Sequence, residues 1–323
     1  MGIILINLLL GVIGLFGLYF GGEKLVTGSV TIASTLKLRP QLIAVTIIAL
    51  GTSLPELVVS VNAVLKDSPD IAFGNVVGSN ISNLLCVLGL AAIAAPLYIQ
   101  RGTLKIDVFW LLLASSIFAT SAQFLSSISL WGGFLLILLL LLVITHLAYV
   151  SLDTHNGKIA NKIGYDVEIK GKLLYGLMTV FFGALILLGS AELVVFSAKK
   201  IAAFLFIPEV FIGLTIIAMG TSLPEIAASV VAVKKGYSDI AIGNVVGSNI
   251  FNSLGIIGAS AIASGSNKFV APENFLKFDI MAMLCITIII GGILLYARKV
   301  GGYLGIIFLC TYLAYILISF QQM

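Results

Sequence analysis

Charged residues are scarce in this sequence. Only 10% of its 323 residues are charged, 60% are hydrophobic, and the mean hydropathy is +1.16. Soluble globular proteins carry about a quarter charged residues. The chain has too little polar surface to cover a water-exposed body, so the composition excludes a water-soluble enzyme and a disordered chain. It indicates a helical protein that crosses a lipid bilayer several times.

Cysteine and histidine are also rare. The three cysteines, Cys86, Cys285 and Cys310, all lie in apolar runs and are odd in number, so no disulfide framework is implied. The two histidines, His146 and His155, are not near an acid that would make a proton relay. The net charge of +4 requires no nucleic-acid partner, because cytoplasmic loops of membrane proteins collect Lys and Arg. No obligatory protein partner is indicated.

Ten apolar stretches are long enough to cross a bilayer, which takes roughly 20 residues. The first lacks a basic leader region and a small-residue cleavage site, so it is predicted to be a retained helix. The predicted fold is an all-α polytopic membrane protein. The ten spans are residues 3–20, 42–64, 71–93, 108–124, 128–150, 173–195, 210–233, 240–262, 280–296 and 302–320.

The distribution of basic residues predicts the orientation in the membrane. With the N-terminus outside, 13 of the 18 Lys and Arg residues fall on the cytoplasmic side. Cytoplasmic loops are enriched in such residues. We therefore expect an integral membrane protein with both termini outside and the linker 151–171 in the cytoplasm.

The chain contains an internal repeat. Residues 46–83 align without gaps to residues 215–252, with 27 of 38 positions identical, and both copies carry GTSLPE and GNVVGSN. Glu23 and Glu192 share the same offset of 169 residues. The predicted halves are residues 1–150 and 172–323, with five helices each. An odd number of spans inverts the second copy, and inverted repeats are typical of secondary transporters whose substrate site lies near the membrane midplane.

Two acidic residues are predicted to lie deep in the membrane. Glu56 and Glu225 stand in the middle of their spans, whereas the other twelve acidic residues are expected in or beside loops. A carboxylate at that depth costs several kcal/mol unless it is paired or faces a wet cavity. No Lys or Arg lies at comparable depth in either repeat core. The compensating charge is therefore expected to be a proton or a bound ion.

Hydroxyl groups accompany each glutamate. Thr52 and Ser53 stand four and three residues before Glu56, so one helical face presents a carboxylate and two hydroxyls. Pro55 cannot donate a backbone hydrogen bond and clashes with the carbonyl of Gly51, which opens the helix and frees carbonyl oxygens. The second copy repeats this arrangement with Thr221, Ser222, Pro224 and Glu225.

The second motif of each copy adds further polar groups. Ser79 and Asn83 lie four residues apart on one helical face, as do Ser248 and Asn252. The combined set supplies carboxylate, hydroxyl, amide and carbonyl oxygens, which suit hard cations such as Ca²⁺ and Na⁺ and argue against zinc or copper. Any single Ser, Thr or Asn could instead be an interhelical hydrogen-bonding residue. The glycines of this motif are predicted to allow close helix packing. They are Gly74, Gly78, Gly243 and Gly247.

The duplicated GTSLPE and GNVVGSN motifs resemble the two alpha-repeats of the cation/Ca²⁺ antiporter superfamily, in its Na⁺/Ca²⁺ exchanger branch. The short linker is similar to that of prokaryotic members, and this resemblance implies that the protein lies in a prokaryotic cell membrane. The resemblance implies that Glu56 and Glu225 bridge the central cation sites and that the first helix of each half slides against the other eight. It also implies further ligands: the oxygens of Thr52, Ser53, Thr221 and Ser222, the carbonyls of Ala49 and Ala218, Ser79 and Ser248 at the outer and inner Na⁺ sites, and Asn83 and Asn252 at the middle position.

One position departs from part of this family. Some relatives, including K⁺-dependent exchangers, carry Asp where this chain has Asn252. With Asn at both position 83 and position 252, the pocket holds two formal negative charges instead of three. This argues against K⁺ co-transport.

The sequence therefore predicts a transporter and not an enzyme, without a cofactor, that exchanges Na⁺ for Ca²⁺ across the membrane by alternating access. Exchange of H⁺ for Ca²⁺ or another divalent cation by the same two glutamates stays open, since a buried empty carboxylate can take a proton. A channel is disfavoured because channels usually build their pores from several subunits. A hydrolase is disfavoured because no His or second acid is placed to activate Ser53 or Ser222.

Overall fold

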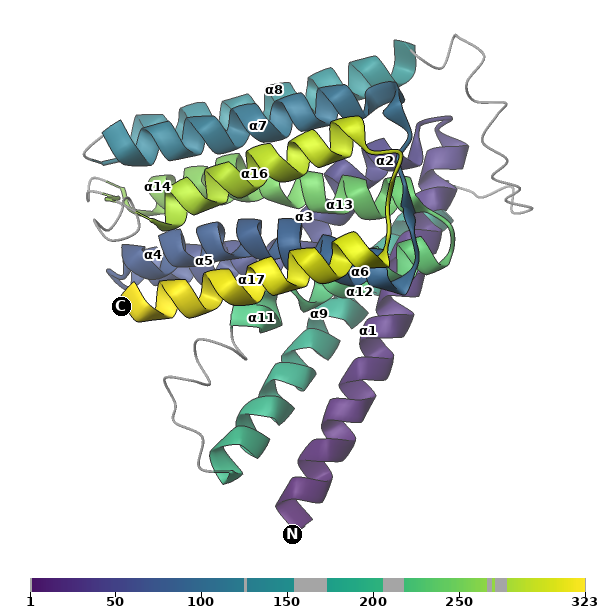
Figure 1. Ribbon diagram of the computed structural model, residues 1–323, viewed down its shortest axis with the longest axis vertical. Helices are drawn as coiled ribbons and strands as arrows, with labels where there is room; N and C mark the ends of the chain where they lie inside the picture. Colours follow the sequence, from purple (N-terminus) through teal and green to yellow (C-terminus); the bar gives the residue numbers. More distant parts are fainter. Residues whose placement is uncertain are drawn as a thin grey trace.

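The computed structural model describes residues 2–124, 127–153, 173–205, 218–265, 269–270 and 278–322. These residues are almost entirely helical (Figure 1). In the first half the elements are α1 (Gly2–Thr35), α2 (Pro40–Ile43), η1 (Ala44–Ile48), α3 (Ala49–Thr52), α4 (Leu54–Leu65), α5 (Pro69–Ser82), η2 (Asn83–Val87), α6 (Leu88–Ala94), β1 (Leu97–Tyr98), α7 (Arg101–Phe124) and α8 (Leu130–Asp153). The η elements are π-helical turns.

The second half follows the same plan. Its elements are α9 (Leu173–Phe204), α11 (Ala218–Thr221), α12 (Leu223–Lys234), α13 (Ser238–Ile250), the π-helical η6 (Phe251–Ile256), α14 (Ile257–Ala263), α16 (Asp279–Tyr296), β2 (Lys299–Val300) and α17 (Gly302–Gln322). The two short strands join the halves, because β1 pairs antiparallel with β2 and places Leu97 opposite Val300.

Eight helices of the described residues are long and apolar enough to cross a membrane, and a ninth span forms if the bent pair Pro40–Thr52 and Leu54–Leu65 counts as one. The predicted all-α polytopic architecture is confirmed. The predicted span 210–233 falls partly outside the described residues, which include its second part as α11 and α12. The predicted linker lies outside them as well, apart from its first residues, which extend α8 to Asp153.

The first helix of each half is longer than predicted. The predicted spans 3–20 and 173–195 are shorter than α1 and α9, which have 34 and 32 residues. Glu23 and Glu192 therefore lie within helices, and the expectation that they sit in or beside loops is wrong. Glu23 forms an ion pair with Lys235, from the other half of the chain.

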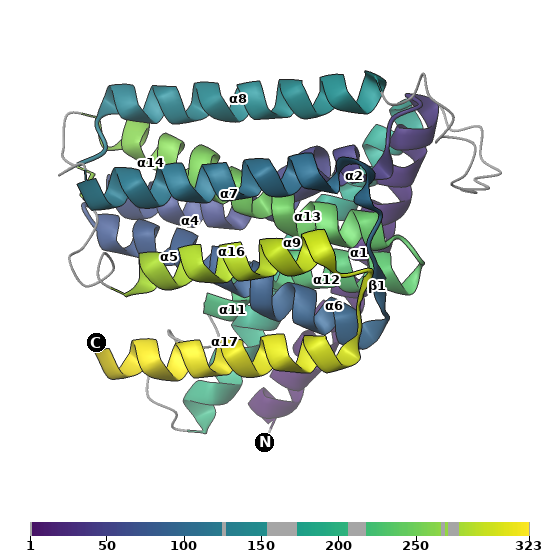
Figure 2. The same ribbon diagram turned by 45° about the horizontal axis from the view of Figure 1, so that its top comes forward.

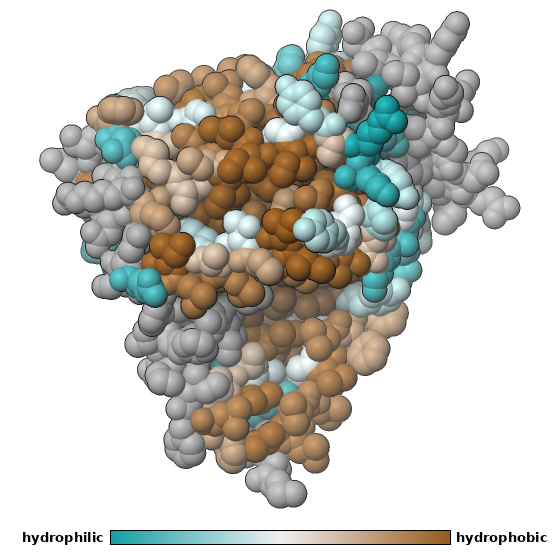
Figure 3. All heavy atoms as spheres, viewed as in Figure 1, coloured by the Kyte–Doolittle hydropathy of each residue, from teal (hydrophilic) through white to brown (hydrophobic). Residues whose placement is uncertain are grey.

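The helices that carry the repeated motifs form the centre of the molecule. In an 18-residue stretch of the spans Pro69–Ala94 and Ser238–Ala263, 83% and 94% of the residues are buried, compared with 28% and 17% in Leu130–Ser151 and Gly302–Ser319. Figure 2 shows α8 and α17 on opposite sides of this central layer. Many of their exposed side chains are large and apolar, and the face of the molecule seen in Figure 3 is largely brown. A protein with a polar centre and an apolar exterior is suited to lipid.

Candidate functional site

Each GTSLPE motif breaks its helix just before the glutamate. Ser53 separates α3 from α4, and the two segments of this span meet at a bend of 46°. Pro55 lies in the first turn of α4, where its missing N–H costs no helical hydrogen bond. Glu56 and Glu225 thus lie in the first turns of α4 and α12. Helix N-termini carry a partial positive charge that favours a carboxylate.

The two glutamates are fully buried and lie close to each other. Glu56 and Glu225 are 1% and 0% exposed. The hydroxyl of Ser53 does not cap its own helix but donates across the repeat to Oε1 of Glu225, at 3.2 Å. Thr221 of the second half is hydrogen-bonded to Glu56, and the two carboxylates interact electrostatically. Among the described residues Ser222, the repeat counterpart of Ser53, makes no such bond. One site therefore takes a carboxylate from each half.

Several polar atoms of the predicted set have no hydrogen-bond partner although they are buried. Buried polar groups in native proteins are nearly always satisfied, so a cluster of unsatisfied ones requires an explanation. A bound cation supplies one, because it would coordinate the free oxygens. The unpartnered atoms among the predicted residues are Oε2 of Glu56, Oε2 of Glu225, Oγ of Ser222, Oγ of Ser248, Oδ1 of Asn83, and both Oδ1 and Nδ2 of Asn252.

The remaining predicted residues are placed as follows. Thr52 is buried, and its hydroxyl donates to Oδ1 of Asn244 at 3.2 Å and approaches the Ala49 carbonyl at 3.4 Å. That carbonyl also accepts the N–H of Ser53, so it keeps its helical hydrogen bond. Ser79 is buried on α5. Ala218 is the first described residue of α11.

The donor set contains oxygens and no soft ligands. In the part of the chain that the structure describes, no group of three or more His, Cys, Asp and Glu side chains is placed to hold a metal ion. A site of this kind would depend on hydroxyl, amide and carbonyl oxygens together with two carboxylates. Such ligands suit Ca²⁺ and Na⁺ better than zinc or copper.

A pair of asparagines that sequence reasoning did not single out supports the site. Asn75 donates to the backbone oxygen of Glu56 at 3.0 Å and to Ser60 at 2.9 Å. Asn244 donates to Ser229 at 3.1 Å and accepts from Thr52. Each asparagine and its serine recur at the offset of 169, which is the signal that could have identified them. They fix the motif helices against each other beside the glutamates.

The second motif also changes the helix itself. Asn83 begins the π-helical turn η2, and Asn252 lies in η6. Such turns are frequent at functional sites. Hydrogen bonds join the two halves nearby, because Asn80 donates to Ser253 at 3.0 Å and Asn249 donates to the carbonyl of Asn80 at 3.1 Å. The two second-motif helices are thus held together next to the candidate cation ligands.

The glycines of the second motif differ between the halves. A Cβ at Gly243 would meet Ala44 and the carbonyl of Gln41 at about 3 Å, and one at Gly247 would collide with the backbone of Val45. The packing role is confirmed for these two. Among the described residues it is wrong for Gly78, where a Cβ would meet nothing within 4 Å.

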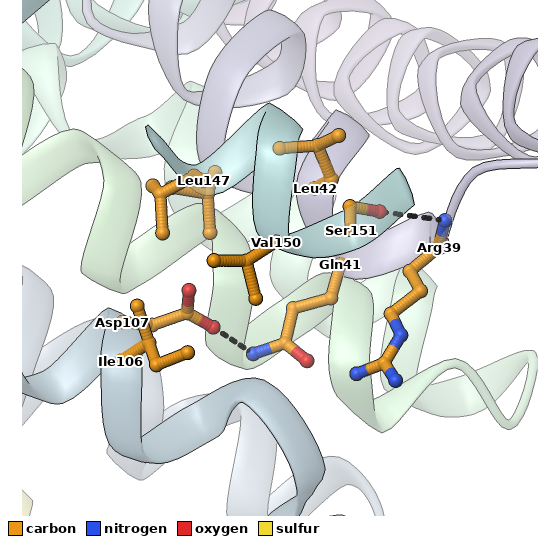
Figure 4. A pocket seen from close by; sticks show the side chains of 9 residues that line it. Arg39, Gln41, Leu42, Ile106, Asp107, Leu147, Val150 and Ser151 are labelled. Atoms are coloured by element: carbon orange, nitrogen blue, oxygen red, sulfur yellow. Dashed lines mark hydrogen bonds between the residues drawn. The ribbon is translucent and has the colours of Figure 1, made fainter. Parts of the chain in front are cut away.

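A second polar cluster surrounds a cavity of about 20 Å³ at the start of α2 (Figure 4). The amide of Gln41 donates to Asp107, and the backbone N–H of Arg39 donates to Ser151 at 3.4 Å. Burial lowers the pKa of the Arg39 guanidinium, while the carboxylates of Asp107 and Asp239 act in the opposite direction. This cluster ties α2 to α7 and α8 and contains none of the predicted ligands.

Comparison with known proteins gives one consistent result. The family model described as sodium/calcium exchanger protein matches residues 6–149 and 175–321. The chain is 32% identical to a putative antiporter, CaxA, of Alkalimonas amylolytica, over 96% of this chain and 97% of that protein. It is 28% identical to the sodium/calcium exchanger MaX1 of Methanosarcina acetivorans, over 98% and 99% of the two chains.

Solved structures show the same similarity in three dimensions. The structure of the sodium-calcium exchanger NCX_Mj soaked with 2.5 mM Na⁺ and 10 mM Sr²⁺ matches with a TM-score of 0.80 at 30% identity. The match covers 97% of this chain and 99% of that one. The prediction of ten transmembrane helices in two five-helix repeats agrees with this similarity over nearly the whole chain.

Proposed function

Since the chain belongs to the sodium/calcium exchanger protein family, we propose that it exchanges Na⁺ for Ca²⁺ at one site shared by Glu56 and Glu225. Membership of this family makes it a membrane antiporter of cations. The choice of Na⁺ as the coupling ion is the proposal. The main support for the shared site is the pair of buried carboxylates, one from each half, whose second oxygens have no partner.

Charge balance explains why two such carboxylates would couple the ions. Two negative charges are neutralised by one Ca²⁺ or by two Na⁺. Both cargoes would use the same oxygens, so Ca²⁺ cannot occupy the site while Na⁺ fills it. A vacant site with two uncompensated charges would be costly to carry through the membrane interior, which suppresses uncoupled leak. Competition for one site is therefore the basis of exchange.

The other predicted ligands complete the proposed site. Hydroxyl and amide oxygens of the repeated motifs would surround the carboxylates, and the break at Ser53 makes room for backbone oxygens. The full proposed set is Glu56, Glu225, Thr52, Ser53, Thr221, Ser222, Ser79, Ser248, Asn83, Asn252 and the carbonyls of Ala49 and Ala218. The predicted orientation, with both termini outside the cell, is part of the same proposal.

Flux measurements with separate gradients test the coupling ion. The purified protein in proteoliposomes is expected to take up radioactive Ca²⁺ when Na⁺ is loaded inside, and to show no uptake when choline replaces Na⁺ at equal pH on both sides. A K⁺ gradient is expected to add nothing. Uptake driven by a pH gradient without Na⁺ would contradict the proposal and favour exchange of H⁺ for Ca²⁺.

The charge count of the site gives a further prediction. The Asn252→Asp substitution would add a third carboxylate among groups that are fully buried and unpartnered. One Ca²⁺ would then leave one negative charge uncompensated, at a cost of several kcal/mol. We expect Na⁺-driven Ca²⁺ uptake to fall at least about tenfold at neutral pH, because a several-kcal/mol cost exceeds the 1.4 kcal/mol of a factor of ten.

The repeat offers a second, equivalent variant that tests the same prediction. Asn83→Asp places the same charge at the counterpart position of the first half. A loss of similar size and its partial recovery at lower pH, where the added acid is neutral, are expected for both variants. Unchanged uptake in both would show that neither amide lies beside the transported ions.

A further inference from the structure

The helices α1 and α9 pack against each other with two-fold symmetry. Gly14 of α1 lies against Val194 of α9, and Gly183 of α9 lies against Leu25 of α1. These two contacts are related by the repeat offset of 169, since Gly14 corresponds to Gly183 and Leu25 to Val194. Figure 1 shows the two helices side by side and projecting beyond the rest of the molecule. The interface between α1 and α9 is therefore two-fold symmetric, because each half contributes the same contact.

The way this helix pair packs on the other helices is not symmetric. Gly22 of α1 lies against Ala227 and Val231 of α12, and Val231 is only 3% exposed. The repeat counterparts on α4 are Val58 and Asn62, which are both exposed, Val58 by 55%. In this conformation α1 covers its face of α12, whereas the equivalent face of α4 is open.

An ion pair follows the same asymmetry. Nζ of Lys235, just after α12, lies 2.7 Å from Oε1 of Glu23 on α1. The repeat counterparts are Lys66, just after α4, and Glu192 on α9. Both counterparts are exposed, and among the described residues no ion pair joins them. The chain thus contains two acid–base pairs related by the repeat, and of these the Glu23–Lys235 pair is formed in this conformation.

We propose that Glu23–Lys235 and Glu192–Lys66 are alternate latches, each holding the α1–α9 pair in one of its two transport positions. The inference rests on the proposed antiport, in which inverted repeats alternate by exchanging their conformations around a fixed site. The symmetric α1–α9 interface can stay intact during that exchange. The contact of α1 with α12 is then replaced by a contact of α9 with the open face of α4.

The inverted repeat gives the latches opposite locations. Because the second half enters the membrane from the other side, the end of α12 and the end of α4 lie toward opposite surfaces. Each lysine is at such an end, and each glutamate lies within a long apolar helix. Pairing compensates the glutamate charge in one position only, so breaking one latch favours the other position.

Crosslinking tests the two latches directly. In a background without the native cysteines Cys86, Cys285 and Cys310, one variant carries Glu23→Cys and Lys235→Cys, and another carries Glu192→Cys and Lys66→Cys. A bifunctional thiol reagent that spans the length of the two replaced side chains is expected to link both pairs and to stop transport in each. The control Glu23→Cys with Lys66→Cys, which pairs residues of one half, is expected to stay unlinked.

The two crosslinks must also be mutually exclusive within one molecule. In a variant with all four cysteines, each molecule is expected to carry either one link or the other, as read by mass spectrometry of the digested protein. No link between positions 192 and 66 in a protein that transports Ca²⁺, or both links in the same molecule, would overturn the proposal. Crosslinking does not depend on which ion is coupled. Failure of the Na⁺ assignment would therefore appear in the flux measurement and not here.

Charge removal gives a second, milder test. Exposed ion pairs are worth a few tenths to one kcal/mol, which corresponds to a population shift of about two- to fivefold. Lys235→Gln is expected to raise the crosslinking rate at positions 192 and 66 by about that factor. Lys66→Gln is expected to raise the rate at positions 23 and 235 instead. Shifts in the same direction for both variants would contradict alternate latches.

Discussion

Replacing Glu56 or Glu225 with Gln is expected to reduce Na⁺-driven Ca²⁺ uptake to the level of protein-free vesicles. Either substitution keeps the size of the side chain but leaves one negative charge where two are needed to balance one Ca²⁺. Both residues are fully buried, so water cannot compensate the missing charge. Radioactive Ca²⁺ uptake into proteoliposomes measures the effect. The exposed Asp70, which also lies in the repeated segment 46–83, provides the control variant Asp70→Asn and is expected to leave uptake unchanged.

The same variants are expected to fold. Two buried carboxylates that repel each other destabilise the ion-free protein, so removing one charge should not lower its midpoint of thermal unfolding. The stabilisation that Ca²⁺ gives to the unmodified protein should disappear, because a ligand stabilises only a state that binds it. Normal uptake in either variant, or a Ca²⁺-dependent shift of undiminished size, would refute the shared site.

Adding one methyl group at Gly247 is expected to destabilise the protein by several kcal/mol. A Cβ there collides with the backbone of Val45, which cannot move aside as a flexible side chain could. Overpacking in a tight interior costs about 1–3 kcal/mol and more where backbone must shift. The Gly247→Ala variant should therefore unfold at a much lower temperature in detergent, as followed by fluorescence or loss of the monodisperse peak.

The counterpart glycine provides the matched control. Gly78 has open space around the position of a Cβ, and it lies within helix α5. Alanine is up to about 1 kcal/mol more favourable than glycine inside a helix, so Gly78→Ala should leave the thermal stability unchanged or slightly higher. Equal losses of thermal stability in Gly247→Ala and Gly78→Ala would contradict the difference in packing around the two glycines.

The sequence alone predicts the fold, and it singles out Glu56 and Glu225 as the residues proposed for the centre of the site. Long apolar stretches identify membrane helices because the bilayer tolerates few charges. A repeat with 27 of 38 identical positions identifies the two halves and their inversion. Glu56 and Glu225 stood out because a mid-span carboxylate is costly without a partner. The structure brings them together as that reasoning required.

Other features depend on contacts between residues far apart in the chain. Glu23 of α1 pairs with Lys235, 212 positions away, and no local pattern reports that contact. Asn244 likewise holds Thr52 from the other half. The packing around Gly78 and Gly247 differs although the sequences around both glycines are the same, so their own motif does not report which segment approaches them.

The position of a bound divalent cation tests the account most directly. Crystals of the protein grown with Ca²⁺ and without Na⁺ are expected to show one strong anomalous peak between the carboxylates of Glu56 and Glu225, with oxygens of both at about 2.3–2.6 Å. The peak should vanish when Na⁺ replaces Ca²⁺. A protein that transports Ca²⁺ but shows the peak elsewhere, or keeps it at saturating Na⁺, would contradict a single site for which the two ions compete.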